Sequence, residues 1–202
     1  MIKRIAAIWI ILGCAALLMA GCSSVRVDRK DVDETIDLSG NWNDSDSRMV
    51  SEDMIKDCLD RPWLGNYRTN HRRDPVVIVG TVRNRSDEHI NTQTFVKDLE
   101  RALTNSGEVQ FVASAEERGE VRNERQDQQS NSSEATAKEQ GQETGADFML
   151  QGSINTISDR IEGKEVRYYQ VNLELIDIQS NRKAWIGEKK IKKFVRRNRL
   201  GL

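Results

Sequence analysis

The chain has 202 residues, of which 37% are hydrophobic, 31% charged and only 5% aromatic, and its formal net charge is −1. This length fits one ordinary domain with appendages, and this composition argues against more than one modest core. Apolar residues are concentrated in 5–18, whereas 25–74 and 113–145 are mostly polar. The core must therefore come mainly from the segments between and after those polar stretches.

The N-terminal segment, residues 1–21, has the parts of a signal peptide. Lys3 and Arg4 precede an almost wholly apolar stretch from Ile5 to Leu18. That stretch is shorter than the roughly 20 apolar residues that a membrane-spanning helix needs. We predict a cleaved signal, with two alternatives: a short transmembrane anchor that is retained, or a secretory signal followed by an unmodified cysteine.

The ending "LLMAGCSS" resembles the bacterial lipobox, in which small residues precede a cysteine that receives diacylglycerol. Met19 stands where leucine is more usual. The resemblance implies that Cys22 becomes the acylated N-terminus, carrying chains such as palmitate. It also implies sorting to the outer membrane, because Ser23 rather than Asp follows the cysteine. Two or three acyl chains anchor a protein stably. The processed chain has 29 basic and 32 acidic side chains, a net charge of −3.

Residues 22–43 predict a lipidated N-terminus and a polar, flexible tether, because charged residues and serines dominate without apolar periodicity. The cysteines agree with an exported protein. Cys14 leaves with the signal and Cys22 is acylated, so no intramolecular disulfide can form. Cys58 shares a helical face with Val50, Met54 and Ile55, which predicts a buried structural thiol.

Periodicity predicts the folded elements in chain order. These are a short helix over 46–59, a loop over 61–75 pinned by Trp63 and Tyr67, a strand over 76–82 covered on both faces, a helix near 92–106 that Gly107 ends, and a short strand over 108–112. Residues 113–145 predict two largely exposed helices broken near "QSNSS", with disorder as the alternative.

Three more strands follow, over 145–154, 168–178 and 184–194. In the second, Tyr169, Val171, Leu173 and Leu175 alternate with polar residues, as in a sheet with one packed face. The last two form an antiparallel hairpin in which Asn181 tolerates a left-handed turn position. The prediction is a single small α/β domain over 44–195, with a mostly antiparallel mixed sheet of four to five strands flanked by helices.

Several phrases, in order, resemble the LpoB family: "VRNRSDEHINT", "ALTNSGEVQFV", "TGADFMLQGSI" and "YYQVNLELIDIQSNRKAWIGEKKIKK". The resemblance implies an outer-membrane lipoprotein that faces the periplasm of a Gram-negative bacterium. It also implies that the chain binds and activates a class A penicillin-binding protein, a peptidoglycan synthase.

The family phrases contain Asn84, Arg85, Ser86, His89 and Trp185, as structural or partner-surface residues. Side chains that bond their own backbone suit the bend at Asn84 and Ser86. His89 is expected to bond the backbone at the approach to the helix, and Trp185 to bury a large area behind the last hairpin.

Little in the sequence suggests catalysis or a cofactor. The two histidines, His71 and His89, lie in no metal-binding or nucleophile motif, so we predict a non-enzymatic regulator. The end of the chain is basic from Lys189 onward, including the tail at 196–202. Export argues against nucleic acid as its partner, which leaves an anionic lipid or polymer surface, or a charged edge strand that resists aggregation.

The main alternative function is a lipoprotein component of an envelope secretion or assembly complex related to curli-channel proteins. That function requires long amphipathic segments able to form a barrel, and the sequence shows none of suitable length and alternation. The oligomeric state is left open.

Overall fold

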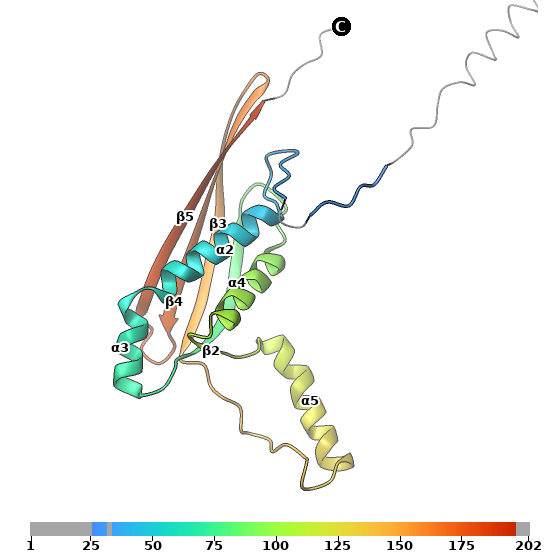
Figure 1. The fold of residues 1–202 in the computed structure, drawn as a ribbon, viewed down its shortest axis with the longest axis vertical. Coiled ribbons are helices and arrows are strands. Elements are labelled where there is room, and N and C mark those ends of the chain that lie inside the picture. Colours follow the sequence, from blue (N-terminus) through green and yellow to red (C-terminus); the bar gives the residue numbers. More distant parts are fainter. Residues whose placement is uncertain (1–25, 32–33, 197–202) are drawn as a thin grey trace, which may run out of the picture. The chain divides into compact units, whose positions relative to one another are not determined.

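The structure is a computed structural model that describes residues 26–31 and 34–196. The chain divides into a unit that ends at Glu34 and a unit that begins at Thr35, and every helix and strand described here belongs to the second. In chain order these are α2 (Asp44–Leu59), α3 (Pro62–His71), β1 (Val76–Arg85), α4 (Thr92–Ser106), β2 (Gln110–Phe111), α5 (Ala115–Asn131), β3 (Phe148–Ile161), β4 (Lys164–Asp177) and β5 (Lys183–Arg196) (Figure 1).

The five strands form one mixed sheet in the order β2-β1-β3-β4-β5. β1 is parallel to β2 and β3, whereas β3, β4 and β5 pair antiparallel. The predicted α/β domain with a mostly antiparallel mixed sheet is thus confirmed. Asn181 adopts φ +58° in the turn between β4 and β5, which confirms the expected left-handed position.

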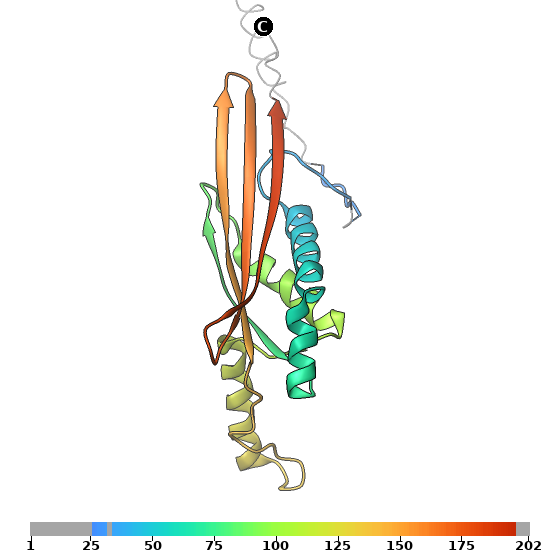
Figure 2. The same ribbon diagram turned by 90° about the vertical axis from the view of Figure 1, so that its left-hand side faces the viewer.

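One face of the sheet carries the core. Helices α2 and α4 cover this inner face, while the described part of the chain places no helix over the outer face of β3, β4 and β5 (Figure 2). Tyr169, Val171 and Leu173 of β4 are fully buried and belong to the same hydrophobic core as Phe95 and Leu99 of α4. The alternation read from the sequence of β4 is therefore confirmed. Gly107 ends α4 with φ +68°, also as expected.

The segment predicted as a loop over 61–75 instead contains α3, so that prediction is wrong. Pro62 stands in the first turn, where a helix has no use for the missing N–H, and Arg72 closes the helix in the left-handed conformation. Trp63 and Tyr67, one helical turn apart, are both buried against Phe148, with ring centroids 5.0 and 5.4 Å away. The prediction that they pin this segment to the domain is confirmed.

The polar segment after β2 forms one helix rather than two. Ser114 and Glu117 make a capping box at the start of α5, and no residue of α5 is buried. Residues 132–147 contain no helix, so the second predicted helix is wrong. Its alanines, Ala135 and Ala137, are not buried, so little packing offsets the cost of ordering a helix.

Cys58 is 1% exposed, and burial raises the pKa of its thiol to about 12. The prediction of a buried structural thiol is confirmed. None of the helices in the described part is long and apolar enough to cross a membrane. The predicted signal peptide, Cys22, Ser23 and the tail beyond Arg196 lie outside the described residues.

Candidate functional site

The turn after β1 is closed by its own side chains. Asn84 Oδ1 accepts hydrogen bonds from the Ser86 backbone N–H at 2.9 Å and the Ser86 hydroxyl at 2.6 Å, and Asn84 Nδ2 donates to the Glu88 carbonyl at 2.7 Å. Such local bonds replace the strand ladder and fix the path toward α4. The prediction that Asn84 and Ser86 hold this bend through their own backbone is confirmed.

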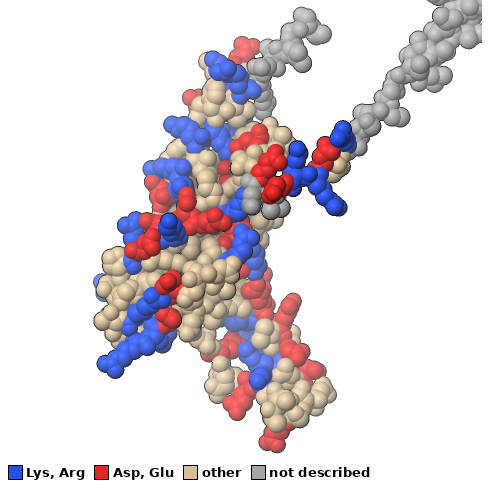
Figure 3. Space-filling view, in the orientation of Figure 1, with Lys and Arg blue, Asp and Glu red and all other residues tan. Residues whose placement is uncertain are grey.

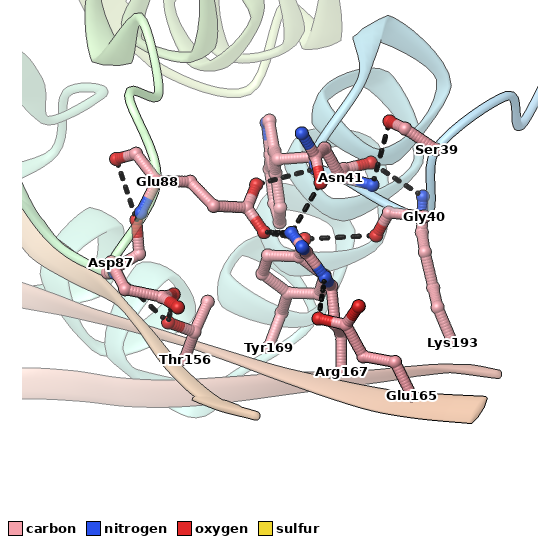
Figure 4. A network of polar contacts seen from close by, with 12 residues as sticks. Ser39, Gly40, Asn41, Asp87, Glu88, Thr156, Glu165, Arg167, Tyr169 and Lys193 are labelled. Atoms are coloured by element: carbon pink, nitrogen blue, oxygen red, sulfur yellow. Dashed lines mark hydrogen bonds and ion pairs between the residues drawn. The ribbon is translucent and has the colours of Figure 1, made fainter. Parts of the chain in front are cut away.

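The turn carries the Glu88 carboxylate over the inner face of β4 (Figure 4). Glu88 Oε1 lies 2.5 Å from the Tyr169 hydroxyl and accepts a hydrogen bond from Arg167 Nη1, while Oε2 accepts from the Trp42 backbone N–H at 3.1 Å. The Glu88 and Arg167 side chains are only 10% and 11% exposed. The Glu88 carboxylate and the Arg167 guanidinium stabilise each other, because burial of either charge without a partner is costly.

Arg167 lies between two carboxylates. Its Nε donates to Glu165 Oε1 at 2.7 Å, its Nη1 donates to Glu88 and Asn41, and Arg160 contacts Glu165 at 2.8 Å. Burial opposes the charge of Arg167, but hydrogen bonds to Glu165, Tyr169 and Glu88 outweigh it and raise the Arg167 pKa. Arg160, and then Arg167, lower the pKa of Glu165. Two cations and two anions thus form a balanced network.

Tyr169 connects this network to the core. The residue is fully buried, and burial, followed by the neighbouring Glu88 carboxylate, raises the pKa of its hydroxyl. The hydroxyl therefore keeps its proton. The hydroxyl donates this one proton either to Glu88 Oε1, at 2.5 Å, or to the Gly40 carbonyl oxygen, at 3.1 Å.

Residues 37–43, here called the strap, run from the N-terminal part of the chain across the network to α2. Lys193 of β5 holds the strap, since its Nζ donates to Asp37 at 2.6 Å, to the Asn41 carbonyl at 3.2 Å and to Asp46 of α2 at 2.6 Å. The Trp42 ring meets Phe95 and Tyr169 edge to face, with centroids 6.0 and 5.6 Å away.

The predicted tether, 22–43, includes the strap, and the structure assigns the strap to the domain. Gly40 makes the close approach possible, because it adopts φ +74° and a Cβ there would lie 2.2 Å from Val195 Cγ2. Asn43 then caps α2 through a capping box with Asp46.

Residues 46–191 match the model of a protein family, the peptidoglycan-synthase activator LpoB. The chain belongs to the LpoB family. A search of curated proteins gave no match.

Solved structures of LpoB are among those similar to this chain. The LpoB C-terminal domain from Salmonella enterica is 18% identical, with 65% of this chain and 94% of that chain covered and a TM-score of 0.37. The corresponding domain from Escherichia coli is 16% identical over 66% and 100%, with a TM-score of 0.36. The NMR structure of E. coli LpoB is 14% identical over 89% and 85%, with a TM-score of 0.42.

The structure brings together only some of the residues taken from the LpoB phrases. Asn84 and Ser86 share the turn, whereas Arg85 pairs in register with Asn155 and faces the outer side of the sheet. His89 is exposed and makes no hydrogen bond to a described residue, so the prediction that it bonds the backbone is wrong. The Ile90 N–H bonds the Glu88 carbonyl instead, which leaves the imidazole free to face water.

Trp185 lies apart from the turn. It is 6% exposed, pairs in register with Leu175 and donates from Nε1 to Asp57 of α2 at 2.9 Å. The residue therefore joins β5 to α2.

Sequence reasoning missed Glu88, Glu165, Arg167, Lys193 and the strap. A signal was present in β4, because Glu165 and Arg167 continue the inward phase of Tyr169 and Val171. Two opposite charges at consecutive inward positions of a strand indicate a buried ion pair. The sequence does not predict that Glu88 and residues 37–43 are their partners, because those contacts depend on the tertiary fold.

The network of this LpoB-family domain connects the strap, β4 and the Asn84 turn. The charges of the network are paired with one another, which favours fixed geometry over proton transfer. Within the described residues, no group of His, Cys, Asp and Glu side chains is arranged to hold a metal ion.

Proposed function

We propose that this chain is a lipid-anchored protein of the outer membrane that binds a class A penicillin-binding protein in the periplasm and stimulates its synthesis of peptidoglycan. The observation that carries the proposal is the match of residues 46–191 to a family of peptidoglycan-synthase activators. The comparisons do not favour the alternative of a secretion or assembly component.

The proposed action is regulatory and not enzymatic. A domain that binds the active conformation of a synthase more tightly than the inactive one shifts the equilibrium toward activity. A coupling free energy of about 1–3 kcal/mol changes the balance roughly 5–150-fold. A rigid binding surface suits this task, and the network of Glu88, Glu165 and Arg167 supplies rigidity where the strap, β4 and the Asn84 turn meet.

The anchor is proposed from the sequence. Cys22 is the acylated residue and Ser23 directs the chain to the outer membrane. Because the strap is bound to the domain from Asp37 onward, at most residues 22–36 separate the proposed anchor from the strap. These residues span at most about 50 Å when fully extended. The partner must therefore reach the domain close to the outer membrane.

Two experiments test the proposal. Chain 23–202, immobilised and incubated with envelope extract, is expected to retain a class A synthase. Recovery of this chain as a homo-oligomeric ring without a synthase contradicts the proposed partner.

The second experiment tests the anchor. Cells grown with labelled palmitate are expected to label the full chain but not its Cys22→Ser variant. Equal labelling of both excludes Cys22 as the acylated residue.

A further inference from the structure

One end of the sheet extends beyond the helices. Strands β3, β4 and β5 continue past the N-terminus of α2, and the turn at Glu162 and Gly163 joins β3 to β4 at this end (Figure 2). We call residues 157–168 and 190–196 the distal end. The strap lies at the same end, because Asp37 bonds Lys193 and Gly40 contacts Val195. The N-terminal part of the chain therefore joins the domain where the sheet projects.

The outer face of the distal end carries large apolar side chains that are exposed in the described part of the chain. Strand register places Ile157 beside Tyr168, Val166 beside Phe194, and Ile161 beside Lys164, all on the face opposite the helices. Ile157, Ile161 and Phe194 are 67%, 73% and 57% exposed. Large apolar side chains gathered on one exposed face indicate an interaction surface.

Unpaired cations surround these apolar side chains. Lys164, Lys192 and Arg196 make no hydrogen bond or ion pair through their side chains with another described residue, and each lies on the outer face. The Arg196 guanidinium lies over the Phe194 ring, with Cζ 5.7 Å from the ring centroid. By contrast, Lys189, Lys190 and Lys193 are bound by acidic side chains. Basic side chains follow β5 toward this end in Figure 3.

Acidic residues do not cancel this charge. Asp159 lies on the same face beside Val166, and Glu162 lies in the turn. The processed chain as a whole has 29 basic and 32 acidic residues. The positive charge is therefore local to the distal end, and a general attraction to anions does not follow from composition.

We propose that the distal end binds the anionic phospholipid surface of the membrane that holds the N-terminus. Ile157, Ile161 and Phe194 enter the headgroup region, where apolar side chains leave water, and Lys164, Lys192 and Arg196 face the lipid phosphates. Two copies of this face would repel each other, because both carry unpaired cations. The direction of the domain rests on the proposed anchor, whereas the binding itself does not.

The proposal determines the orientation of the domain relative to the membrane. α3 and α5 lie at the opposite end of the sheet from the distal end (Figure 1). With the distal end on the membrane, these helices point away from it, toward the cell wall.

Co-sedimentation with lipid vesicles tests the proposal. Chain 23–202 lacks acyl chains and keeps every described helix and strand. It is expected to bind phosphatidylethanolamine vesicles that contain phosphatidylglycerol, to lose binding as salt is added, and not to bind vesicles without phosphatidylglycerol. The assay contains no synthase, so its outcome is separate from that of the proposed function.

Matched variants locate the surface. The pair Lys164→Gln and Lys192→Gln is expected to weaken binding about 25-fold, at about fivefold for each cation. The pair Lys56→Gln and Lys138→Gln removes the same charge from two exposed lysines outside the distal end and is expected to change binding by less than about twofold. Equal losses for the two pairs, or equal binding to both kinds of vesicle, overturn the proposal.

An apolar pair completes the test. Ile161→Ser is expected to weaken vesicle binding several-fold more than Ile186→Ser, which removes a 63% exposed isoleucine from the other end of the same face. Equal effects of the two variants contradict insertion of the distal end. If the chain self-associates in lipid-free solution and only Ile161→Ser abolishes this, the face binds a second copy. If the chain binds only an acidic protein, the face belongs to that partner. Either result overturns the lipid proposal.

Discussion

At the residue scale, Arg167 connects the two buried carboxylates of the network. Its guanidinium satisfies Glu88 and Glu165, which are almost completely buried. Replacement by methionine leaves the buried Glu88 carboxylate without its cation and leaves Glu165 with Arg160 alone. We expect Arg167→Met to lower the free energy of unfolding by about 3 kcal/mol, measured by urea denaturation.

Arg83→Met is the matched control, because Arg83 is exposed on a strand and its side chain makes no ion pair with a described residue. We expect this variant to change stability by less than about 0.5 kcal/mol. Similar denaturation midpoints for the two variants would show that the network contributes nothing beyond an ordinary surface arginine.

The ionisation of Glu165 makes the free energy of unfolding of the domain depend on pH. Its pKa in the folded state is lowered, first by Arg160 and then by Arg167, below the ordinary value of 4.5. The stabilisation is therefore complete above the unfolded pKa and is lost as pH falls through the folded one. We expect the urea midpoint of the native chain to fall steeply below about pH 4.5, and that of Glu165→Gln to fall less. Parallel curves would contradict this assignment.

Single residues differ in how far the sequence predicts them. Cys58 could be assigned, because its neighbours on one helical face are apolar and burial follows from that periodicity. Glu88 could not, because its partners Trp42, Arg167 and Tyr169 are distant in sequence. Within this network, only Glu165 and Arg167 leave a local pattern, as opposite charges at consecutive inward positions of β4.

At the element scale, elements with an apolar period were predicted, whereas α3 was missed. The periods of α4 and β4 were clear. α3 was mistaken for a loop because Pro62 was interpreted as a break, although proline is favoured in the first turn of a helix. β3 and β4 extend beyond the predicted strands, to Ile161 and from Lys164, because paired charges replace apolar side chains on their inner face.

The strap depends on a single glycine. Gly40→Ala places a side chain at φ +74° and against Val195, so we expect the strap to detach while the core stays folded. Hydrogen exchange at the Trp42 N–H, which bonds Glu88, is expected to speed up at least about tenfold.

Gly65→Ala is the control for the strap. Gly65 lies inside α3 with open space around it, so alanine is expected to stabilise the helix by about 0.5–1 kcal/mol. Unchanged exchange at Trp42 in Gly40→Ala would show that the strap tolerates the new side chain.

α5 is an element without a core contact. Its charges are bound by neighbours such as Lys97 and Glu143, yet none of its residues is buried. We expect its amides to exchange through local opening well before those of β4, as followed by hydrogen exchange and mass spectrometry. Co-operative exchange of α5 with β4 would indicate packing that the fold does not show.

At the scale of the whole molecule, the order of the elements and the LpoB resemblance followed from the sequence, because the phrases lie along the whole folded part. The length of chain between the proposed anchor and the domain did not follow from the sequence. Residues 37–43 are polar and aperiodic, and only their contacts with Lys193, Arg167 and Tyr169 make them part of the domain.

The most direct test of the central proposal is glycan polymerisation by a purified class A synthase from the same organism, with and without chain 23–202. We predict that the chain raises the rate several-fold at saturation, and that the Arg167→Met variant loses part of this effect as its fold weakens. No change in rate at concentrations well above the binding midpoint, or no binding at all, would contradict the proposed role as an activator.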